Sequence, residues 1–278
     1  MRRRLRMLLA LLLLCAMPFT TGQTEAAEPE IVIEELGAAE WLFPLALEDL
    51  QPEYLVLANK HYLLDRNYVC KPLVSVKGAK YNKDGSRKSG DLLKASGSKM
   101  QLNEVCAKAL AALSDAARAD GYKLYLKSAY RSWTTQNTMY KNRLKKNKGK
   151  DDGWVSMAGA SDHQTGLGCD VIPGSWLKAS GMNSRMASEP ECIWMAEHCA
   201  EFGFIIRYPE GKEDITEIHY EPWHLRYVGI PAATYIMENG LCLEEFILEL
   251  QEAIEDYTAR GGDPRQVEPL RQQPSEGT

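Results

Sequence analysis

The chain has 278 residues, of which 45% are hydrophobic and 26% charged, and its formal net charge is −5. This length exceeds the usual size of one domain, but we expect both ends of the chain to lie outside a smaller folded domain. The acidic balance excludes the net basic surface of a typical nucleic-acid-binding protein, so we expect no nucleic-acid partner.

Residues 1–27 have the pattern of a secretory signal peptide. Four Arg precede an apolar stretch from Met7 to about Phe19, and small and polar residues follow up to Ala27. The stretch is shorter than the roughly 20 residues of a membrane span, so cleavage near Ala27 is favoured over an uncleaved anchor. Lipidation at Cys15 is rejected because Leu14 is not small. We therefore expect a secreted, cell-wall-associated protein without a stable membrane span.

The remaining chain divides into three parts. Residues 28–50 form an acidic lead-in without a clear hydrophobic period. Residues 261–278 are rich in Pro, Gln and Gly, and we expect this tail to be disordered. Residues 51–260 show no internal repeat and are expected to form one domain.

The predicted elements of this domain begin with a helix over residues 102–121, where apolar residues recur at helical spacing. Residues 122–130 alternate as a strand with one exposed face. A helix then begins at Ser132 and ends in "KNRLKKNKGK", a run with six basic residues. The preferred interpretation of this run is a solvated helix end. The alternative is a surface that is attracted to an anionic polymer.

Later elements continue the mixture. We expect strands over residues 166–172, 203–209 and 215–229, and helices over residues 188–204, 231–240 and 243–260. Ser188 and Glu191 stand at capping-box spacing at the start of the first of these helices. Because no regular βαβ repeat is present, the pattern favours an α+β fold.

Two polar windows, "SDHQTGLGCD" and "EPWH", stand where core strands are expected. A zinc hydrolase needs three protein ligands and an open position for water. His163, Asp170 and His224 can supply the three ligands to Zn²⁺. The glycines between His163 and Asp170 allow a tight turn that returns both to one point. Strand alternation then directs Cys169 away from Asp170.

Glu221 lies three residues before His224, close enough for both side chains to reach one reacting centre. Pro222 biases Glu221 toward an extended backbone. A carboxylate at this position suits a general base that later protonates the leaving amine.

The other histidines need no functional interpretation, because a single histidine in a polar loop usually lies on the surface. His61 and His198 are assigned to the surface. His219 shares a strand face with Glu221, so it is either a rival ligand or, as we prefer, a residue that supports the site or lies on the surface.

Six cysteines follow the signal peptide, and an exported chain with an even number can form up to three disulfides. We predict at least one, including Cys70, Cys106 or Cys242, while small buried thiols are the alternative. Cys169 is expected to be free and buried beside the metal site without acting as a ligand. The spacings do not repeat a CxxC zinc pattern.

Several blocks resemble the VanY-type D-alanyl-D-alanine carboxypeptidases, which are zinc enzymes of bacterial cell walls. The blocks are "SAYRSWTTQ", "SDHQTGLGCD", "GFIIRYPEGKEDIT" and "YEPWHLRYVG". The lead-in "LVLANKHYLLDRNYVCKPLV" and the closing "PAATYIMENGLCLEEFI" are similar as well. The likeness covers about residues 52–250. It implies a single domain with an antiparallel sheet and flanking helices, the fold shared with the hedgehog signalling domain.

The resemblance carries the family's ligand pattern onto His163, Asp170 and His224, and its catalytic carboxylate onto Glu221. It implies that Arg131 holds the scissile carbonyl or the terminal carboxylate of the substrate, a task that suits a forked, permanent cation. The further substrate-binding residues that it implies are Gln136, Ser161, Ser128, Tyr130 and Trp223.

This chain departs from the family pattern at Asp162, where Glu is usual, and at Gly168 and Cys169, where an Ala-Val type pair is usual. None of these is a proposed ligand, so the departures put the shape of the loop in doubt and not the activity.

The resemblance implies a zinc carboxypeptidase that removes terminal D-alanine from peptidoglycan stem peptides. The alternatives are an L,D-carboxypeptidase that acts on tetrapeptide stems and a cell-wall-binding module without catalysis. The sequence does not decide the oligomeric state.

Overall fold

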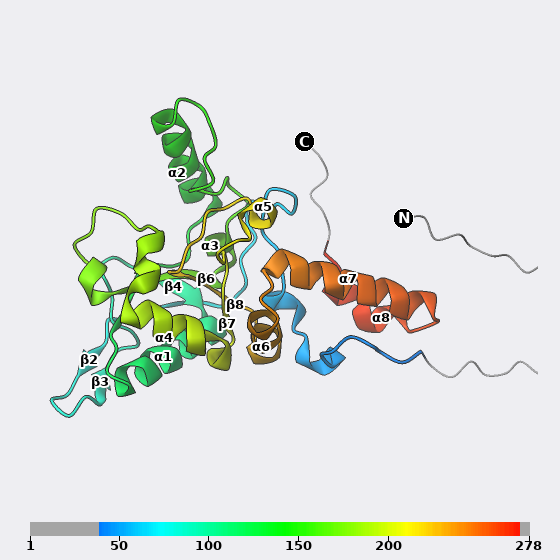
Figure 1. Cartoon of the computed structure of the whole chain (residues 1–278), viewed down its shortest axis with the longest axis horizontal. Coiled ribbons are helices and arrows are strands. Elements are labelled where there is room, and N and C mark those ends of the chain that lie inside the picture. The colour runs from blue at the N-terminus through cyan, green and yellow to red at the C-terminus, as the bar shows by residue number, and fades with distance from the viewer. Residues whose placement is uncertain (1–38, 273–278) are drawn as a thin grey trace, which may run out of the picture. The chain divides into compact units, whose positions relative to one another are not determined.

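The computed structural model describes residues 39–272, so the predicted signal peptide lies outside the described residues. Figure 1 shows a mixture of helices and short strands, which confirms the α+β prediction. The helices are α1 Glu104–Ala119, α2 Trp133–Lys146, α3 Asp162–Thr165, α4 Pro190–His198, α5 Glu213–Thr216, α6 Ile230–Glu238, α7 Leu243–Ala259 and α8 Pro264–Val267. The strands are β1 Leu73–Ser75, β2 Lys80–Tyr81, β3 Arg87–Ser89, β4 Gln101–Asn103, β5 Leu124–Ser128, β6 Gly168–Pro173, β7 Phe204–Ile206 and β8 His224–Tyr227.

The main sheet has the strand order β5-β6-β8-β7, and all its neighbouring strands are antiparallel. The pairs β1–β4 and β2–β3 form two smaller antiparallel sheets. Every residue of β6 and β8 is buried. In the register between these two strands Asp170 lies opposite His224, so the two predicted ligands are cross-strand neighbours.

The alternation of β6 separates its two faces. Cys169 and Val171 join the hydrophobic core that also contains residues of α1 and α4, whereas Asp170 does not. A second core cluster contains the apolar residues of α6 and α7 together with Ile205 of β7. The central strands therefore support packed apolar layers and leave one polar face for the site.

Two helix starts match the predictions and one does not. Asn103 and Ser132 cap α1 and α2 by accepting hydrogen bonds from backbone N–H groups in the first turn. The capping box predicted for Ser188 is absent, because Glu189 is the N-cap residue and Pro190 opens α4. Ser188 instead donates a hydrogen bond to the carbonyl of Arg185 at 2.9 Å. Within residues 215–229 only β8 is a strand.

The ends of the domain extend beyond the predicted boundaries. Phe43, in the predicted lead-in, is buried in the second core cluster, and so are Val267 and Leu270 in the predicted disordered tail. The Gln272 side chain also accepts a hydrogen bond from the Leu57 N–H at 2.9 Å. The expectation of disorder is therefore wrong for residues 261–272, because the apolar side chains of this segment pack. Residues 273–278 lie outside the described part.

The predicted disulfide is also wrong. All six cysteines in the described residues are free thiols, and all six are buried. Each occupies a position in the interior where a small apolar side chain fits, which is a common environment of unpaired cysteine. The prediction that Cys169 is free and buried is confirmed.

Among the helices within residues 39–272, none combines the length and the apolar character that a membrane span requires.

Candidate metal centre and active site

Three neighbouring elements carry the predicted ligands. His163 lies in α3, Asp170 in β6 and His224 at the start of β8. Gly166 ends α3 in the left-handed region, at φ 79°, and turns the chain directly into β6. A side chain at Gly166 would also meet Leu73 at 2.7 Å. One ligand atom from each of the three residues lies within 4.8 Å of the others, so the group can hold a metal ion.

Hydrogen bonds orient the two imidazoles. The Nδ1 of His163 lies 2.7 Å from the carbonyl oxygen of Ala129, which places the proton on Nδ1 and leaves a lone pair on Nε2. That Nε2 lies 3.4 Å from Asp170 Oδ1 and has no hydrogen-bond partner within the described residues. The Nδ1 of His224 lies 3.1 Å from the same oxygen. An orphaned buried nitrogen that faces a carboxylate fits a missing cation.

The protonation states also fit a metal. Burial, together with the positive charge of Arg131, lowers the pKa of His163 to about 4, so its ring is neutral at neutral pH. Burial alone would raise the pKa of Asp170, but the nearby His163 and His224 hold it well below its usual value. Imidazole nitrogens and a carboxylate are typical zinc ligands, and three of them leave room for a fourth, exchangeable position.

Glu221 stands beside the ligands and is ionised less easily than an ordinary glutamate. Its carboxylate lies 3.6 Å from His224 Nδ1, and its backbone N–H donates to the carbonyl of Tyr208 at 3.0 Å. Burial and the charge of Asp170 raise the pKa of Glu221 well above its usual value, against the opposing effect of Arg131. A carboxylate with a raised pKa can both accept and return a proton near neutral pH.

These groups share one cavity of about 190 Å³. Its lining contains the three predicted ligands, Glu221 and four of the predicted substrate residues, namely Arg131, Gln136, Ser161 and Trp223. Ser128 and Tyr130 are not among the lining residues. Ser128 pairs with Asp170 from the neighbouring strand β5, and the Tyr130 N–H donates to the carbonyl of Gln101 at 2.9 Å.

Arg131 and Gln136 have unused polar atoms in this cavity. The Nε of Arg131 and the Oε1 of Gln136 are buried and have no hydrogen-bond partner in the described part of the chain. The Gln136 Nε2 donates to the carbonyl of Ser156 at 2.7 Å, which fixes the orientation of its amide. Buried polar atoms without partners are costly, so both groups are suited to bind a polar ligand.

Two aromatic residues of the cavity, Trp154 and Tyr208, were not among the residues predicted from the sequence. The Tyr208 ring lies 5.0 Å from that of His224, and the Trp154 ring lies 4.5 Å from that of His219. The Nε2 of His219 is 2.9 Å from the carbonyl oxygen of Asp152, so His219 supports the loop that carries Trp154. It is not in the ligand group. The sequence did offer a signal for Tyr208, because this residue lies inside "GFIIRYPEGKEDIT", one of the blocks that resemble the VanY family.

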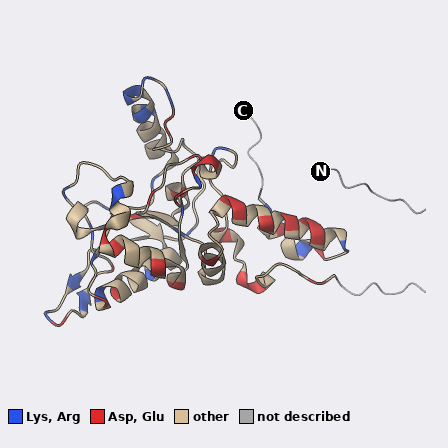
Figure 2. Cartoon of the chain, viewed as in Figure 1, with Lys and Arg blue, Asp and Glu red and all other residues tan. Residues whose placement is uncertain are grey.

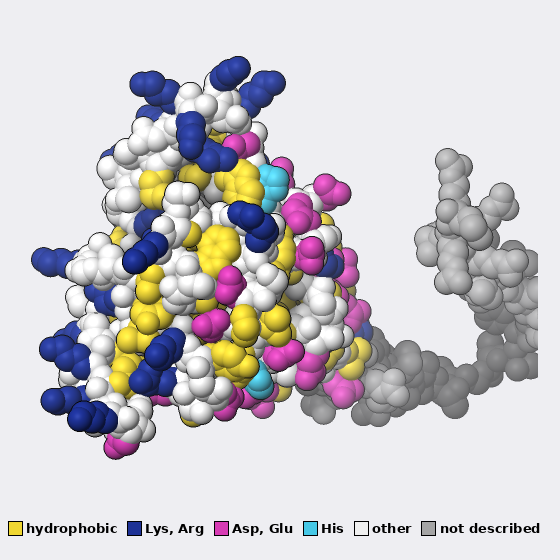
Figure 3. All heavy atoms as spheres, turned by 60° about the vertical axis from the view of Figure 1, so that its left-hand side comes forward, with side chains coloured by type: hydrophobic (Ala, Val, Ile, Leu, Met, Phe, Trp, Pro, Cys, Tyr) yellow, Lys and Arg dark blue, Asp and Glu magenta, His cyan; other side chains and the backbone are white. Residues whose placement is uncertain are grey.

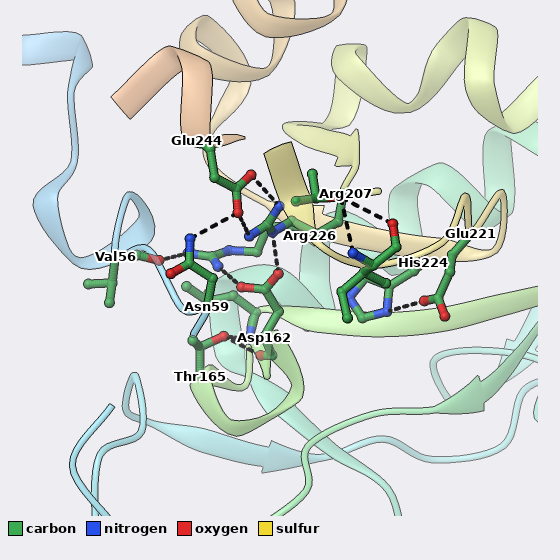
Figure 4. A network of polar contacts seen from close by, with 12 residues as sticks. Val56, Asn59, Asp162, Thr165, Arg207, Glu221, His224, Arg226 and Glu244 are labelled. Carbon is green, nitrogen blue, oxygen red and sulfur yellow. Dashed lines mark hydrogen bonds and ion pairs between the residues drawn. The ribbon is translucent and has the colours of Figure 1, made fainter. Parts of the chain in front are cut away.

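A network of buried charges lies next to the ligands (Figure 4). Asp162 precedes His163 and accepts hydrogen bonds from Arg207 Nε, at 2.5 Å, and from Arg226 Nη1. Arg207 also donates two bonds to Glu244 of α7, at 2.7 and 2.8 Å. These three residues of the network, Asp162, Arg207 and Arg226, are completely buried.

The network connects segments that are far apart in the sequence. Arg226 donates from Nη2 to the carbonyls of Tyr54, at 2.9 Å, and Val56, at 2.6 Å. Burial alone would raise the pKa of Asp162, but Arg226 and Arg207 lower it, so Asp162 is ionised. The segments that carry His163 and His224 are thus tied to each other, to α7 and to residues 54–56.

Gly168 makes room for Asp162. A Cβ atom at Gly168 would lie 2.8 Å from the Cβ of Asp162 and 2.9 Å from its carbonyl carbon, closer than real Cβ contacts allow. Two positions at which the sequence departs from the family pattern therefore touch each other, and the glycine permits the close approach of α3 to β6.

Comparisons with known proteins identify relatives of this chain. A family model described as VanY, D-alanyl-D-alanine carboxypeptidase, matches residues 99–230. The putative carboxypeptidase YodJ of Bacillus subtilis (strain 168) is 37% identical over 203 residues, which cover 72% of this chain and 70% of that protein.

Two solved structures are similar as well. The structure of the LdcB LD-carboxypeptidase is 36% identical, with a TM-score of 0.57, and the match covers 71% of this chain and 87% of that one. A mutant of the D,D-pentapeptidase VanY from a VanB-type resistance cassette, in complex with Zn(II), is 30% identical, with a TM-score of 0.50 and coverage of 70% and 99%. These neighbours have the hedgehog/DD-peptidase fold. The chain described here is accordingly a member of the VanY family of D-alanyl-D-alanine carboxypeptidases.

Proposed function

We propose that this protein is a secreted, zinc-dependent carboxypeptidase that removes the terminal D-alanine from peptidoglycan stem peptides. The observation that carries the proposal is the convergence of His163, Asp170 and His224 with Glu221 and Arg131 in one buried cavity. The relative in complex with Zn(II) supports the choice of metal.

The ligands would be His163 through Nε2, His224 through Nδ1 and Asp170 through its carboxylate. When bound there, zinc supplies Lewis-acid polarisation of the scissile carbonyl and makes water nucleophilic at neutral pH. The fixed tautomer of His163 and the ionised Asp170 prepare these ligand atoms without a change of protonation.

Glu221 takes the proton from the attacking water and later gives it to the leaving amine of D-alanine. Burial and the charge of Asp170 raise its pKa, which strengthens it as the proton acceptor of the first step. The C–N bond of the terminal peptide breaks, and the products are the shortened stem peptide and free D-alanine.

Arg131 binds the negative charge of the substrate. Its half-buried side chain lines the same cavity as Glu221, and its buried Nε has no hydrogen-bond partner within residues 39–272. In a water-poor site a fixed cation of this kind holds the terminal carboxylate or the developing oxyanion. Gln136 and Ser161 add polar contacts on the same wall, and Trp223 adds an apolar one. Ser128 and Tyr130 do not line the cavity, and Ser128 instead lies opposite Asp170 in the register of β5 with β6.

A second candidate is an L,D-carboxypeptidase that acts on tetrapeptide stems. The likeness to the LdcB LD-carboxypeptidase favours this candidate, because the LdcB structure has a higher TM-score and a higher sequence identity to this chain than the VanY structure has. The two candidates share the same catalytic groups and differ in the stem peptide that fits.

Mass spectrometry of purified mature protein with zinc tests both candidates. The protein is offered a stem pentapeptide that ends in D-Ala-D-Ala and, separately, the tetrapeptide. Loss of one alanine from the pentapeptide, abolished by a chelator and by Glu221→Ala, supports the D,D-carboxypeptidase. Cleavage of the tetrapeptide alone assigns the L,D activity, and cleavage of neither refutes the proposal and favours a binding module.

A further inference from the structure

The outer end of α2 carries a dense group of lysines. Residues 141–150 contain six basic residues and no acidic one, although the chain as a whole is acidic. In Figures 1 and 2, α2 projects from the sheet and its outer end is basic, and the same end is covered with Lys and Arg side chains in Figure 3. The five lysines, all exposed, are Lys141, Lys145, Lys146, Lys148 and Lys150.

The acidic residues that follow this segment are engaged elsewhere. Asp152 accepts hydrogen bonds from Arg143 at 2.6, 2.9 and 3.0 Å. Asp151 lies 3.2 Å from the ammonium of Lys60. Among the ion pairs within residues 39–272, none includes any of the five lysines. Their charge is therefore available to a partner.

Local structure accounts for only part of this group of lysines. Lys148 has a φ of 54°, in the left-handed region that favours glycine, and Gly149 follows with a φ of 84°. Lys141 and Lys145 lie one helical turn apart, where like charges repel. The helix dipole favours cations only in the last turn, which begins after Lys141. The dipole therefore favours Lys145 and Lys146, which lie in that turn, but local structure gives no reason for lysine at positions 141, 148 and 150.

We propose that the five lysines form a docking surface for a linear phosphodiester polymer of the cell envelope. The location of this partner rests on the proposed function, which puts the enzyme at the cell wall. Lysine ammonium groups act as point charges and bind phosphate without the forked geometry of arginine. The segment 141–150 contains no aromatic residue, so it has no platform on which nucleic-acid bases would stack.

The docking surface lies close to the catalytic cavity without forming part of it. Gln136 and Met139, in the first half of α2, line the cavity. At 1.5 Å per residue along the helix, the lysines begin about 8 Å beyond Gln136 and Lys146 lies about 15 Å from it. The acidic residues of α7 stand apart from this end in Figure 2. Binding through α2 therefore directs α7 away from the polymer and keeps the cavity near the wall.

Binding of the full mature protein to poly(glycerol phosphate) tests the proposal. Three proteins are compared, namely the wild type, a variant with all five docking lysines changed to Gln, and a control with five other exposed lysines changed to Gln. The control lysines are Lys71, Lys77, Lys80, Lys83 and Lys88. Both variants lose the same charge, so a difference between them reports the position of the lysines.

We expect the docking variant to lose at least about tenfold in affinity, and the control less than about twofold. The slope of log K against log salt for the wild type should approach about −3.5, the value for five phosphate contacts on a flexible strand. Equal losses in the two variants would overturn the proposal, and so would equally tight binding of a single-stranded DNA of the same charge.

Release of D-alanine from a soluble stem peptide separates this proposal from the proposed function. We expect equal kcat/KM for the three proteins, because none of the changed lysines lines the cavity. A wild type that binds the polymer and cleaves no stem peptide would overturn the proposed function alone. Full cleavage by a wild type that does not bind the polymer would overturn the docking surface alone.

Discussion

The strongest prediction concerns Asp162, whose replacement by Asn should destabilise the fold. Asp162 is completely buried, and it is the carboxylate partner of Arg226 in the described structure. Asn has nearly the same shape, but its amide has no negative charge and can place N–H donors against guanidinium donors. The variant would leave Arg226 buried with carbonyl partners only.

The magnitude follows from the burial of the pair. Removal of one partner of a buried ion pair costs about 3–5 kcal/mol, because the other charge stays uncompensated. Domains are stable by about 5–15 kcal/mol, so the variant should still fold while losing a large part of its stability. With a urea m-value near 3 kcal/mol/M, the unfolding midpoint should fall by about 1–2 M.

Urea denaturation of the wild type, Asp162→Asn and Glu244→Gln measures this effect. Glu244 is a half-buried member of the network, and its loss still leaves Arg207 paired with Asp162. The Glu244 variant should therefore lose less stability than the Asp162 variant. Equal midpoints for wild type and Asp162→Asn would refute the reasoning that this carboxylate compensates two buried cations.

Metal affinity provides an independent measurement. Asp162 precedes His163, and Arg226 follows His224 by two residues on β8, so a relaxed network should misplace two ligands. Loss of a supporting contact of this kind weakens zinc binding by about 10–100-fold. A competition titration with a chelating dye measures this, and an unchanged zinc affinity would show that the network contributes to stability alone.

Four further predictions follow from the site and the core. Glu221→Gln should lower kcat by at least about 100-fold while zinc content stays near one equivalent, and a rate within tenfold of wild type would contradict its role as base. Gly168→Ala should cost about 1–3 kcal/mol in urea denaturation, since the added methyl group meets the backbone of Asp162, whereas an unchanged midpoint would contradict the close approach. The pKa of Asp162 is lowered in the folded state, so its contribution to stability is present above its ordinary pKa of 3.8 and is lost as the pH falls further. The difference in unfolding free energy between the wild type and Asp162→Asn should shrink in that range, and a constant difference would exclude this linkage between protonation and stability. Alkylation of the denatured mature protein without reductant should label all six cysteines in a mass spectrum, and a protected pair would reveal a disulfide.

The ligand group was predictable from the sequence because its geometry is local. The turn at Gly166 and the period of β6 place His163 and Asp170 on one side, and the register with β8 adds His224. Only the pairing of β6 with β8 joins residues that are far apart in the sequence. The two polar windows, which stand where core strands are expected, already indicated this pairing. The structure brings these three side chains together as the spacing suggested.

The charge network was not predictable in the same way. Arg207 and Arg226 lie in segments that read as strands, and arginine is rarely buried completely unless it is paired. Their common partner is far away in the sequence, so neither period nor spacing indicates the contact. The packed tail was missed for a related reason, because two apolar residues among polar ones, Val267 and Leu270, carry no signal until α7 provides a surface.

The disulfide prediction failed because export and an even cysteine count describe a compartment and not a geometry. A bridge requires two Cβ atoms that face each other at short range. Cys106 and Cys169 instead occupy interior positions of α1 and β6, where burial also raises the pKa of each thiol well above its usual value. A thiol of this kind is neutral and unreactive, and it fills the core as a small apolar group.

The alternation of β8 joins the catalytic site to the stability of the fold. His224 and Arg226 occupy alternate positions of one strand, while Leu225 between them belongs to the hydrophobic core. A strand with two polar side chains on one face is stable only if each finds a partner, since unpaired buried polar groups are costly. Arg226 finds Asp162, whereas the buried Nε2 atoms of His224 and of the neighbouring predicted ligand His163 have no hydrogen-bond partner within residues 39–272. The ion network thus holds this face in place, and a metal ion is what would complete it.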